Sequence, residues 1–232
     1  MASEILKNGI EEILKADFFS IQTEKNDELF EKLTVFTNLL LEWNKKFDLV
    51  NAETEDEIAA RHILDSLAGA SAICAELSNR KRENATIADI GSGAGFPGIP
   101  LACLLPNQKF VFVERMSKRC NFLQNCVREL GLLNVEVEEN QAERLSQNRF
   151  FVATFRAFRP LEKKMLRVLL RILENGGFLA AYKARKTSID AELSALEFLP
   201  PHKIVELSVP FLTQSTKKGE ERERNLVIIE KS

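Results

Sequence analysis

Apolar side chains recur every three to four residues over the first third of the chain, which is the spacing of amphipathic helices. Three segments share this spacing, namely residues 4–16, 27–44 and 55–77. A polar run, SNRKREN at residues 78–84, then interrupts the hydrophobic pattern. We therefore predict an N-terminal helical subdomain over residues 1–80 and a second domain over residues 81–232.

After the polar run, short apolar segments alternate with amphipathic ones. Five segments predict strands: residues 86–90, 109–114, 134–139, 149–155 and 178–183. Four segments between them predict helices: residues 97–105, 117–130, 142–147 and 161–175. The last helix is expected to stop at Gly176 and Gly177. Such alternation predicts a parallel sheet with helices on both faces. Residues 202–210 and 225–231, joined by a hydrophilic loop, predict an antiparallel hairpin at the sheet edge.

The turn after the first predicted strand carries the most informative chemistry. That strand ends in Asp89, and Gly91, Gly93 and Gly95 follow at alternate positions, which gives D-x-G-x-G-x-G. Glycines adopt positive φ without penalty and let the backbone approach a ligand closely. The second strand ends in Glu114, whose carboxylate can accept both hydroxyls of a ribose. The pattern therefore predicts a nucleotide-sized site at the carboxyl edge of the sheet.

Two cofactors fit this loop. Gly93, Gly95 and Gly98 also satisfy G-x-G-x-x-G, the dinucleotide pattern. S-adenosyl-L-methionine (AdoMet) has no pyrophosphate but carries a cationic sulfonium and an ammonium, so the acid Asp89 favours it. The antiparallel hairpin favours it too, because dinucleotide-binding sheets continue parallel. We therefore predict a class I AdoMet-dependent methyltransferase: a Rossmann-like α/β fold with a mostly parallel seven-stranded sheet and an N-terminal helical cap.

The net charge of −2 conceals an asymmetry along the chain. Residues 1–60 hold 6 basic and 14 acidic residues, whereas residues 156–186 hold nine basic and two acidic ones. A solvated helix face is one interpretation of the basic segment. Several of its cations flank strands, however, which favours a polyanionic substrate such as RNA. The candidate RNA-binding residues are Lys118, Arg119, Lys183, Arg185 and Lys186.

The cysteines and the lengths of the apolar runs indicate the cellular compartment and the kinds of partner to expect. The four cysteines lie in apolar, helical contexts without a C-x-x-C pair, which favours reduced core thiols over a metal site or disulfides. No run of eighteen apolar residues occurs, and the N-terminus is acidic, unlike a secretory signal. We expect a cytoplasmic monomer with neither a metal nor a membrane partner.

Several motifs together resemble the RsmG (GidB) family, bacterial methyltransferases acting on guanine N7 in 16S small-subunit ribosomal RNA. They are LLLEWNKKFDLV (39–50), RHILDSL (61–67), DIGSGAGFPGIPLA (89–102), QAE (141–143), RAF (156–158) and AYK (181–183). The likeness runs from about residue 27 to the end of the chain. It implies AdoMet contacts at Gly91, Phe96, Ala142, Glu143 and Arg156. The chain departs from the family pattern at residues 48–50 and at Ala184.

Guanine N7 has a free lone pair, so its methylation needs orientation more than a general base. Arg156, which follows the fourth strand, is the candidate catalytic residue, with an ion pair to Glu143 as the structural alternative. His62 and Asp65 lie one helical turn apart, and a structural hydrogen bond is favoured over proton transfer. Phe96 and Phe158 are candidates for stacking. An AdoMet enzyme with another substrate and a non-catalytic AdoMet- or RNA-binding module remain alternatives.

Overall fold

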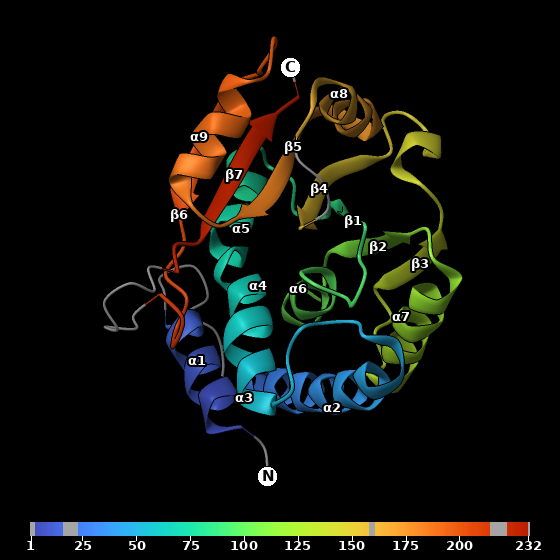
Figure 1. Cartoon of the computed structure of the whole chain (residues 1–232), viewed down its shortest axis with the longest axis vertical. Helices are drawn as coiled ribbons and strands as arrows, with labels where there is room; N and C mark the ends of the chain where they lie inside the picture. The colour runs from blue at the N-terminus through green and yellow to red at the C-terminus, as the bar shows by residue number, and fades with distance from the viewer. Residues whose placement is uncertain (1–2, 16–22, 158–160, 214–221, 232) are drawn as a thin grey trace.

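Seven strands form one mixed sheet in the computed structural model, which describes residues 3–15, 23–157, 161–213 and 222–231 (Figure 1). The strands are β1 (Thr86–Ile90), β2 (Lys109–Glu114), β3 (Val135–Glu139), β4 (Phe150–Arg156), β5 (Leu173–Lys183), β6 (His202–Glu206) and β7 (Asn225–Glu230). Their order across the sheet is β3-β2-β1-β4-β5-β7-β6. The first five run parallel, β7 pairs antiparallel with β5, and β6 pairs antiparallel with β7. The predicted parallel sheet with an antiparallel C-terminal hairpin is confirmed.

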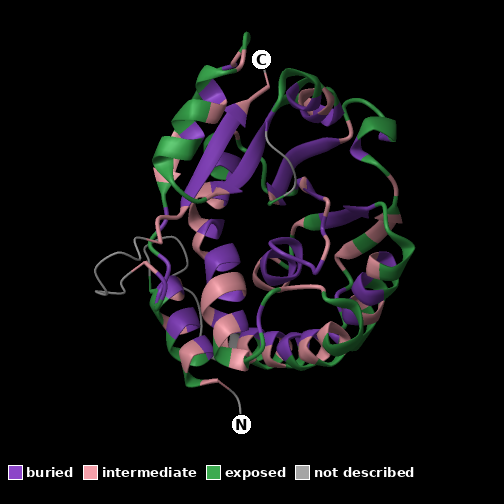
Figure 2. Ribbon diagram, in the orientation of Figure 1, coloured by how far each residue is buried: buried purple, intermediate pink, exposed green. Residues whose placement is uncertain are grey.

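Helices cover both faces of the sheet, as the alternating pattern predicts. They are α6 (Gly98–Leu104), α7 (Ser117–Glu129), α8 (Lys163–Ile172) and α9 (Lys186–Ser194), with a 3₁₀ turn at Ala142–Arg144. The strand residues of β1 and β4 are almost all buried, because each strand lies inside the sheet with helices on both sides (Figure 2). The carboxyl ends of β1, β2, β4 and β5 therefore meet at one edge, which is where the predicted site residues lie.

One expectation for the segment after β4 is wrong, and one helix in this part of the chain was not expected. Helix α8 ends at Ile172 and β5 begins at Leu173, so Gly176 and Gly177 lie inside a strand instead of stopping a helix. A register shift between Phe150 and Val152 makes a bulge there, and Gly176 adopts a φ of +75°. Helix α9 was not expected, because its short polar sequence buries mainly one apolar pair, Ile189 and Leu193.

The N-terminal third is helical, as predicted, but its third helix is subdivided. Helices α1 (Glu4–Leu14) and α2 (Thr23–Phe47) are followed by α3 (Glu55–Ile58), a π-helical turn at Ala59–Ile63, α4 (Leu64–Ala68) and α5 (Ala70–Asn79). The π turn contains Arg61 and His62, and such turns are frequent at functional sites. Gly69, between α4 and α5, packs directly against the ring of Tyr182 on β5, which leaves no room for a side chain.

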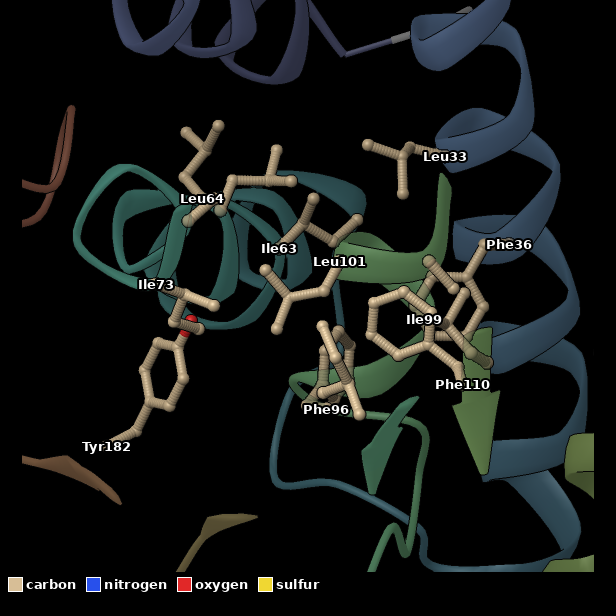
Figure 3. Close-up of a cluster of buried hydrophobic side chains, with 14 of the residues drawn as sticks. Leu33, Phe36, Ile63, Leu64, Ile73, Phe96, Ile99, Leu101, Phe110 and Tyr182 are labelled. Carbon is tan, nitrogen blue, oxygen red and sulfur yellow. The ribbon is translucent and has the colours of Figure 1, made fainter. Parts of the chain in front are cut away.

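One buried hydrophobic cluster joins the N-terminal helices to the sheet. It includes Phe36 of α2, Leu64 of α4, Phe96 of the glycine loop and Phe110 of β2 (Figure 3). A second cluster lies on the opposite face, between the sheet and helices α8 and α9. Because the helices share a core with the sheet, they form a wall above its carboxyl edge. The division of the chain at residue 80 stays a prediction.

The four cysteines are unpaired thiols, as the sequence suggests, and the single tryptophan packs among aromatic rings. All four cysteines are free thiols, and burial raises the pKa of Cys74 to about 11 and that of Cys103 to about 12. They therefore stay protonated near neutral pH. Trp43 packs against Phe47 and Phe122, with ring centroids 5.3 and 5.4 Å away. Within the described ranges, no helix has the length and apolar character to cross a membrane.

Candidate active site

The glycine loop between β1 and α6 adopts the backbone that its sequence predicts. Gly91, Gly93 and Gly95 have φ values of +71°, +54° and +87°, which side chains other than glycine rarely adopt. A Cβ on Gly95 would collide with Ile99 of α6. A Cβ on Gly93 would meet only Gly91 O at 3.6 Å and an Arg119 nitrogen at 3.8 Å. The backbone at Gly93 therefore has open space in front of it, where a ligand can approach.

Glu114 locks the end of β2 to this loop. Its Oε1 accepts hydrogen bonds from the backbone N–H groups of Arg115 (2.7 Å) and Met116 (2.9 Å), and its Oε2 accepts one from Gly93 (3.0 Å). A carboxylate has about four acceptor sites, so one remains, on Oε2. The Glu114 carboxylate can therefore accept a hydrogen bond from one ribose hydroxyl, whereas the sequence suggested two.

A cavity of about 170 Å³ lies in front of the loop. Four of the predicted cofactor-binding residues line it: Gly91, Glu114, Ala142 and Glu143. Arg119, which was predicted to bind RNA, also lines this cavity. The sheet order explains why these residues lie together. Strands β1, β2 and β3 are neighbours, and each of these residues lies at or after the carboxyl end of one of them.

Asp89 is fully buried beneath the loop. Its Oδ2 accepts a hydrogen bond from the backbone N–H of Gly98 (3.1 Å), and Ser92 Oγ donates to its backbone carbonyl (2.9 Å). Its Oδ1 has no hydrogen-bond partner among the described residues. Burial raises the pKa of Asp89 to about 7. The carboxyl group therefore holds the loop against the start of α6, and a direct contact with a cofactor stays a prediction.

Phe96 follows the glycines and packs into the core. Its ring stacks on His62 at a centroid distance of 5.1 Å and an interplanar angle of 27°, and it lies 5.2 Å from the ring of Phe36. The guanidinium of Arg156 lies 4.9 Å from its centroid. These contacts occupy the ring, so a ligand contact by Phe96 stays a prediction. Phe158 lies outside the described residues.

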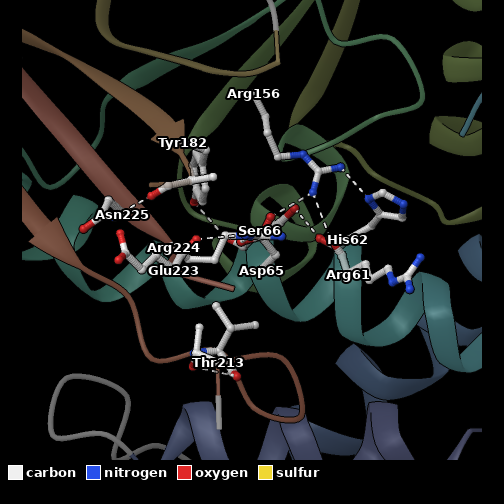
Figure 4. A network of polar contacts seen from close by, with 12 residues as sticks. Arg61, His62, Asp65, Ser66, Arg156, Tyr182, Thr213, Glu223, Arg224 and Asn225 are labelled. Atoms are coloured by element: carbon white, nitrogen blue, oxygen red, sulfur yellow. Dashed lines mark hydrogen bonds and ion pairs between the residues drawn. The ribbon is translucent and has the colours of Figure 1, made fainter. Parts of the chain in front are cut away.

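Arg156 is the centre of a polar network with the π turn and α4 (Figure 4). Its Nη1 donates to Asp65 Oδ2 (3.0 Å) and to the carbonyl of Arg61 (3.2 Å), and its Nη2 lies 2.9 Å from His62 Nδ1. The ion pair of Arg156 is therefore with Asp65, not with Glu143 as the structural alternative had it. Arg224 reaches the same carboxylate, with its Nε 3.2 Å from Asp65 Oδ1.

The protonation state of His62 follows from this geometry. A guanidinium only donates, so Nδ1 of His62 accepts and the ring proton lies on Nε2, which is buried without a hydrogen-bond partner among the described residues. Burial and the neighbouring Arg156 lower the pKa of His62 to about 3. His62 is neutral at physiological pH and serves as a structural acceptor. Its partner is Arg156, which also binds Asp65, so the expected direct hydrogen bond between His62 and Asp65 is wrong.

A larger cavity of about 680 Å³ lies beside this network. Its lining includes four basic and two acidic side chains: Arg61, Arg156, Lys183, Arg224, Asp65 and Glu192. Ala157, which has a φ of +50°, lines this cavity and also the smaller one. The two cavities therefore adjoin at Ala157, directly after the carboxyl end of β4. Sequence reasoning missed Glu192 and Arg224, which have no motif around them, and passed over Arg61 although it begins RHILDSL.

The five predicted RNA-binding residues fall into two groups. Arg119 and Lys183 line the small and the large cavity, respectively. Lys118 on α7, together with Arg185 and Lys186 at the start of α9, is exposed near the carboxyl edge. No group of three or more His, Cys, Asp or Glu side chains that could hold a metal ion occurs in the part of the chain that the structure describes.

Comparisons with known proteins agree with this architecture. A family model described as rRNA small subunit methyltransferase G matches residues 29–226. The Ribosomal RNA small subunit methyltransferase G of Treponema denticola is 36% identical over 258 aligned positions, covering 100% of this chain and 97% of that protein. Its counterpart in Borrelia turicatae is also 36% identical and covers 73% of this chain and 78% of that protein.

Solved structures show the fold class. An SAM-dependent O-methyltransferase of Thermotoga maritima matches with a TM-score of 0.53 at 15% identity, over 83% of this chain and 71% of that one. An SAM-dependent methyltransferase of Aquifex aeolicus matches with a TM-score of 0.52 at 17% identity, over 83% and 98%. The predicted class I methyltransferase fold and the family resemblance are both confirmed. The chain belongs to the rRNA small subunit methyltransferase G (GidB) family of AdoMet-dependent methyltransferases.

Proposed function

We propose that this methyltransferase transfers a methyl group from AdoMet to N7 of a guanine in 16S small-subunit ribosomal RNA. The observation that carries the proposal is the pair of cavities that adjoin at Ala157. Methyl transfer is an in-line displacement, so the donor and acceptor sites must share a boundary. The smaller cavity begins at the glycine loop, and the larger one has cations along its wall, which suits an RNA acceptor.

The residues around the smaller cavity fit AdoMet. The open backbone at Gly93 permits close approach, and the remaining acceptor site on Glu114 Oε2 suits a ribose hydroxyl. Ala142 and Glu143 contribute the wall that follows β3. AdoMet supplies an activated methyl group on a cationic sulfonium. The protein contributes positioning, because guanine N7 needs no deprotonation before it attacks.

Arg156 fits a positioning role better than direct contact with the reacting atoms. Three of its hydrogen-bond contacts go to Asp65, His62 and the carbonyl of Arg61, all on the helical wall. We propose that it fixes that wall beside Ala157 and so shapes the boundary between the cavities. The neutral, buried His62 is an unsuitable proton acceptor for the reaction, which agrees with a mechanism that needs none.

The proposed RNA contact is electrostatic and follows the carboxyl edge of the sheet. Lys118, Arg185 and Lys186 are exposed there, outside both cavity linings. We also propose that the enzyme acts as a monomer in the cytoplasm, where ribosomal RNA is found. The exposed large apolar side chains of the described residues are few and spread along the chain, with two on α2 and the others outside the helices and strands, which supports the monomer: Val35, Phe47, Met116, Leu133, Phe198 and Phe211.

The direct test is a methyl-transfer assay with purified protein, labelled AdoMet and either small ribosomal subunits or naked 16S RNA. Nuclease digestion and mass spectrometry should locate N7-methylguanine at one position. AdoMet binding without transfer would identify a non-catalytic module. Transfer to small molecules but not to RNA would identify another class of acceptor. Either result would overturn the proposal.

A salt titration tests the RNA contact. Replacing Lys118, Arg185 and Lys186 with Gln should reduce the slope of log K against log salt by about two to three, if each contacts one phosphate. A matched control replaces Lys81, Lys109 and Arg128, which are exposed at the opposite, amino edge of the sheet. Equal slopes in the two triple variants would show that the cations near α7 and α9 are only solvated.

A further inference from the structure

One ion pair in the lining of the larger cavity, between Lys183 and Glu192, is separate from the Arg156 network. Lys183, the last residue of β5, places its Nζ 2.8 Å from Oε1 and 2.9 Å from Oε2 of Glu192 on α9. Their side chains are 18% and 20% exposed. Glu192 also accepts a hydrogen bond from the backbone N–H of Leu161. An ammonium donor and a two-oxygen acceptor are therefore held side by side in the cavity lining.

The sheet register places this pair next to the boundary between the cavities. Arg156 of β4 pairs with Tyr182 of β5, so the following residues, Ala157 and Lys183, succeed them at the same edge. Starting at the boundary with the smaller cavity, the lining of the larger cavity passes from Ala157 to Lys183 and then to Glu192. The neighbouring Arg156, by contrast, is committed to the helical wall.

Guanine presents its polar groups in a matching order. N7 and O6 are adjacent acceptors, and the N1–H and N2–H donors follow around the ring. Adenine presents a donor and then an acceptor at the corresponding positions, so it would face the same pair with the wrong polarity. Enzymes that act on an extruded base read it through hydrogen bonds to this edge.

The geometry points to Lys183 and Glu192 as the residues that select guanine in the larger cavity, an inference that rests on the proposed function. With N7 toward Ala157, Lys183 donates to O6 and Glu192 accepts from N1–H and N2–H. Before the base enters, the two side chains neutralise each other, so neither charge is left unpaired. Guanine replaces the ammonium at Glu192 with its own two donors and gives the ammonium a new acceptor. A base without those donors leaves the carboxylate unpaired.

The first arm of the test maps the wild-type product in small-subunit RNA. Synthetic RNA fragments or reconstituted particles then carry guanosine or inosine at the mapped position. Inosine lacks the N2 amino group but keeps O6 and N7. Wild type should prefer guanosine by about 10- to 100-fold in kcat/KM, the value of one hydrogen bond to a charged group, because inosine keeps N1–H and loses only the N2 donor. Glu192→Gln, which replaces one acceptor with a donor, should lose most of that preference.

Two further variants separate reading of the base from a structural effect. Lys183→Gln should slow both substrates and keep the guanosine preference, because both bases carry O6. Glu197→Gln is the matched control, since Glu197 lies just beyond α9, pairs with Lys163 and is absent from the cavity lining. It should resemble wild type. AdoMet affinity should stay unchanged in Glu192→Gln. Its melting temperature should fall, because Lys183 loses its partner, but Lys183→Gln breaks the same ion pair and should keep the guanosine preference. Glu192→Asp serves if Glu192→Gln does not fold.

The outcomes separate failure of the proposed function from failure of the inference that Lys183 and Glu192 select guanine. If wild type forms no N7-methylguanine in small-subunit RNA, the proposed function fails. If it does, but guanosine and inosine react equally, or Glu192→Gln keeps the wild-type preference, the inference alone is wrong. If Lys183→Gln loses the guanosine preference while Glu192→Gln keeps it, the assignment of the two side chains is wrong as well.

Discussion

The Arg156 network is expected to hold the helical wall to the sheet, and Arg156→Met tests this. Methionine keeps much of the side-chain length but removes the charge and all donors. The change removes one of the two cationic partners of Asp65, whose side chain is 5% exposed, and leaves the lone pair of His62 Nδ1 without a donor. Removing one partner of a buried ion pair typically costs about 3–5 kcal/mol.

The lower end of that range fits this site. The Arg156 side chain is 17% exposed, and Asp65 keeps Arg224 at 3.2 Å. We therefore expect a loss of about 3 kcal/mol in unfolding free energy, which for a chain of this size lowers the melting temperature by about 6–12 °C. Domains of this kind are stable by about 5–15 kcal/mol, so the variant should remain folded at 25 °C.

Urea unfolding followed by circular dichroism measures the change, with Arg128→Met as the control. Arg128 pairs with Glu129 on the surface, where the side chains are 72% and 46% exposed, and its loss should cost at most about 0.5 kcal/mol. Asp65→Asn should recover part of the loss in the Arg156→Met background, since it removes a buried carboxylate that has lost one of its two cationic partners. A double-mutant cycle should give a coupling of at least about 1 kcal/mol. Additive effects, or an Arg156→Met variant within about 1 kcal/mol of wild type, would refute this account of the network.

Three further predictions concern the cofactor loop and pH. Gly93→Ala should weaken AdoMet binding about tenfold or more, because its Cβ would point into the open space at the loop. Gly131→Ala, with a similar φ of +60° and open surroundings, should leave calorimetric affinity unchanged, and equal effects would show that only backbone strain matters. Glu114→Gln should raise the AdoMet Kd about 10- to 100-fold, since a charged hydrogen bond contributes about 1.5–3 kcal/mol, and unaltered affinity would remove Glu114 from the site. The lowered pKa of His62 means that the unfolded chain binds its proton near pH 6.5 but the folded chain only near 3. The contribution of neutral His62 to the free energy of unfolding is therefore complete above pH 6.5 and falls by about 1.4 kcal/mol per pH unit between pH 6.5 and pH 3. In urea unfolding, the stability difference between wild type and His62→Gln should shrink from pH 6.5 to pH 4. Parallel pH profiles of the two proteins would contradict this prediction.

Local sequence determined the parts of this protein that depend on backbone preference and periodicity. The strand, glycine turn and helix from Thr86 to Leu104 follow from an apolar run and from three glycines whose positive φ the loop requires. The parallel sheet and its final hairpin follow from the alternation of elements. Glu114 was placed at the site because parallel strands end at one edge. These features need only neighbouring residues or the topology of the chain.

The tertiary structure decided which polar side chains meet. Arg156 lies 91 positions from Asp65 along the chain, and Glu192 belongs to a helix that the sequence did not reveal. The direction of the Asp89 carboxyl, toward α6 instead of the cavity, depends on how closely that helix packs. Hydrophobic spacing predicts which face of an element is buried, but not which partner a long charged side chain finds there. That choice follows from the packing of the helical wall on the sheet, through contacts distant in sequence.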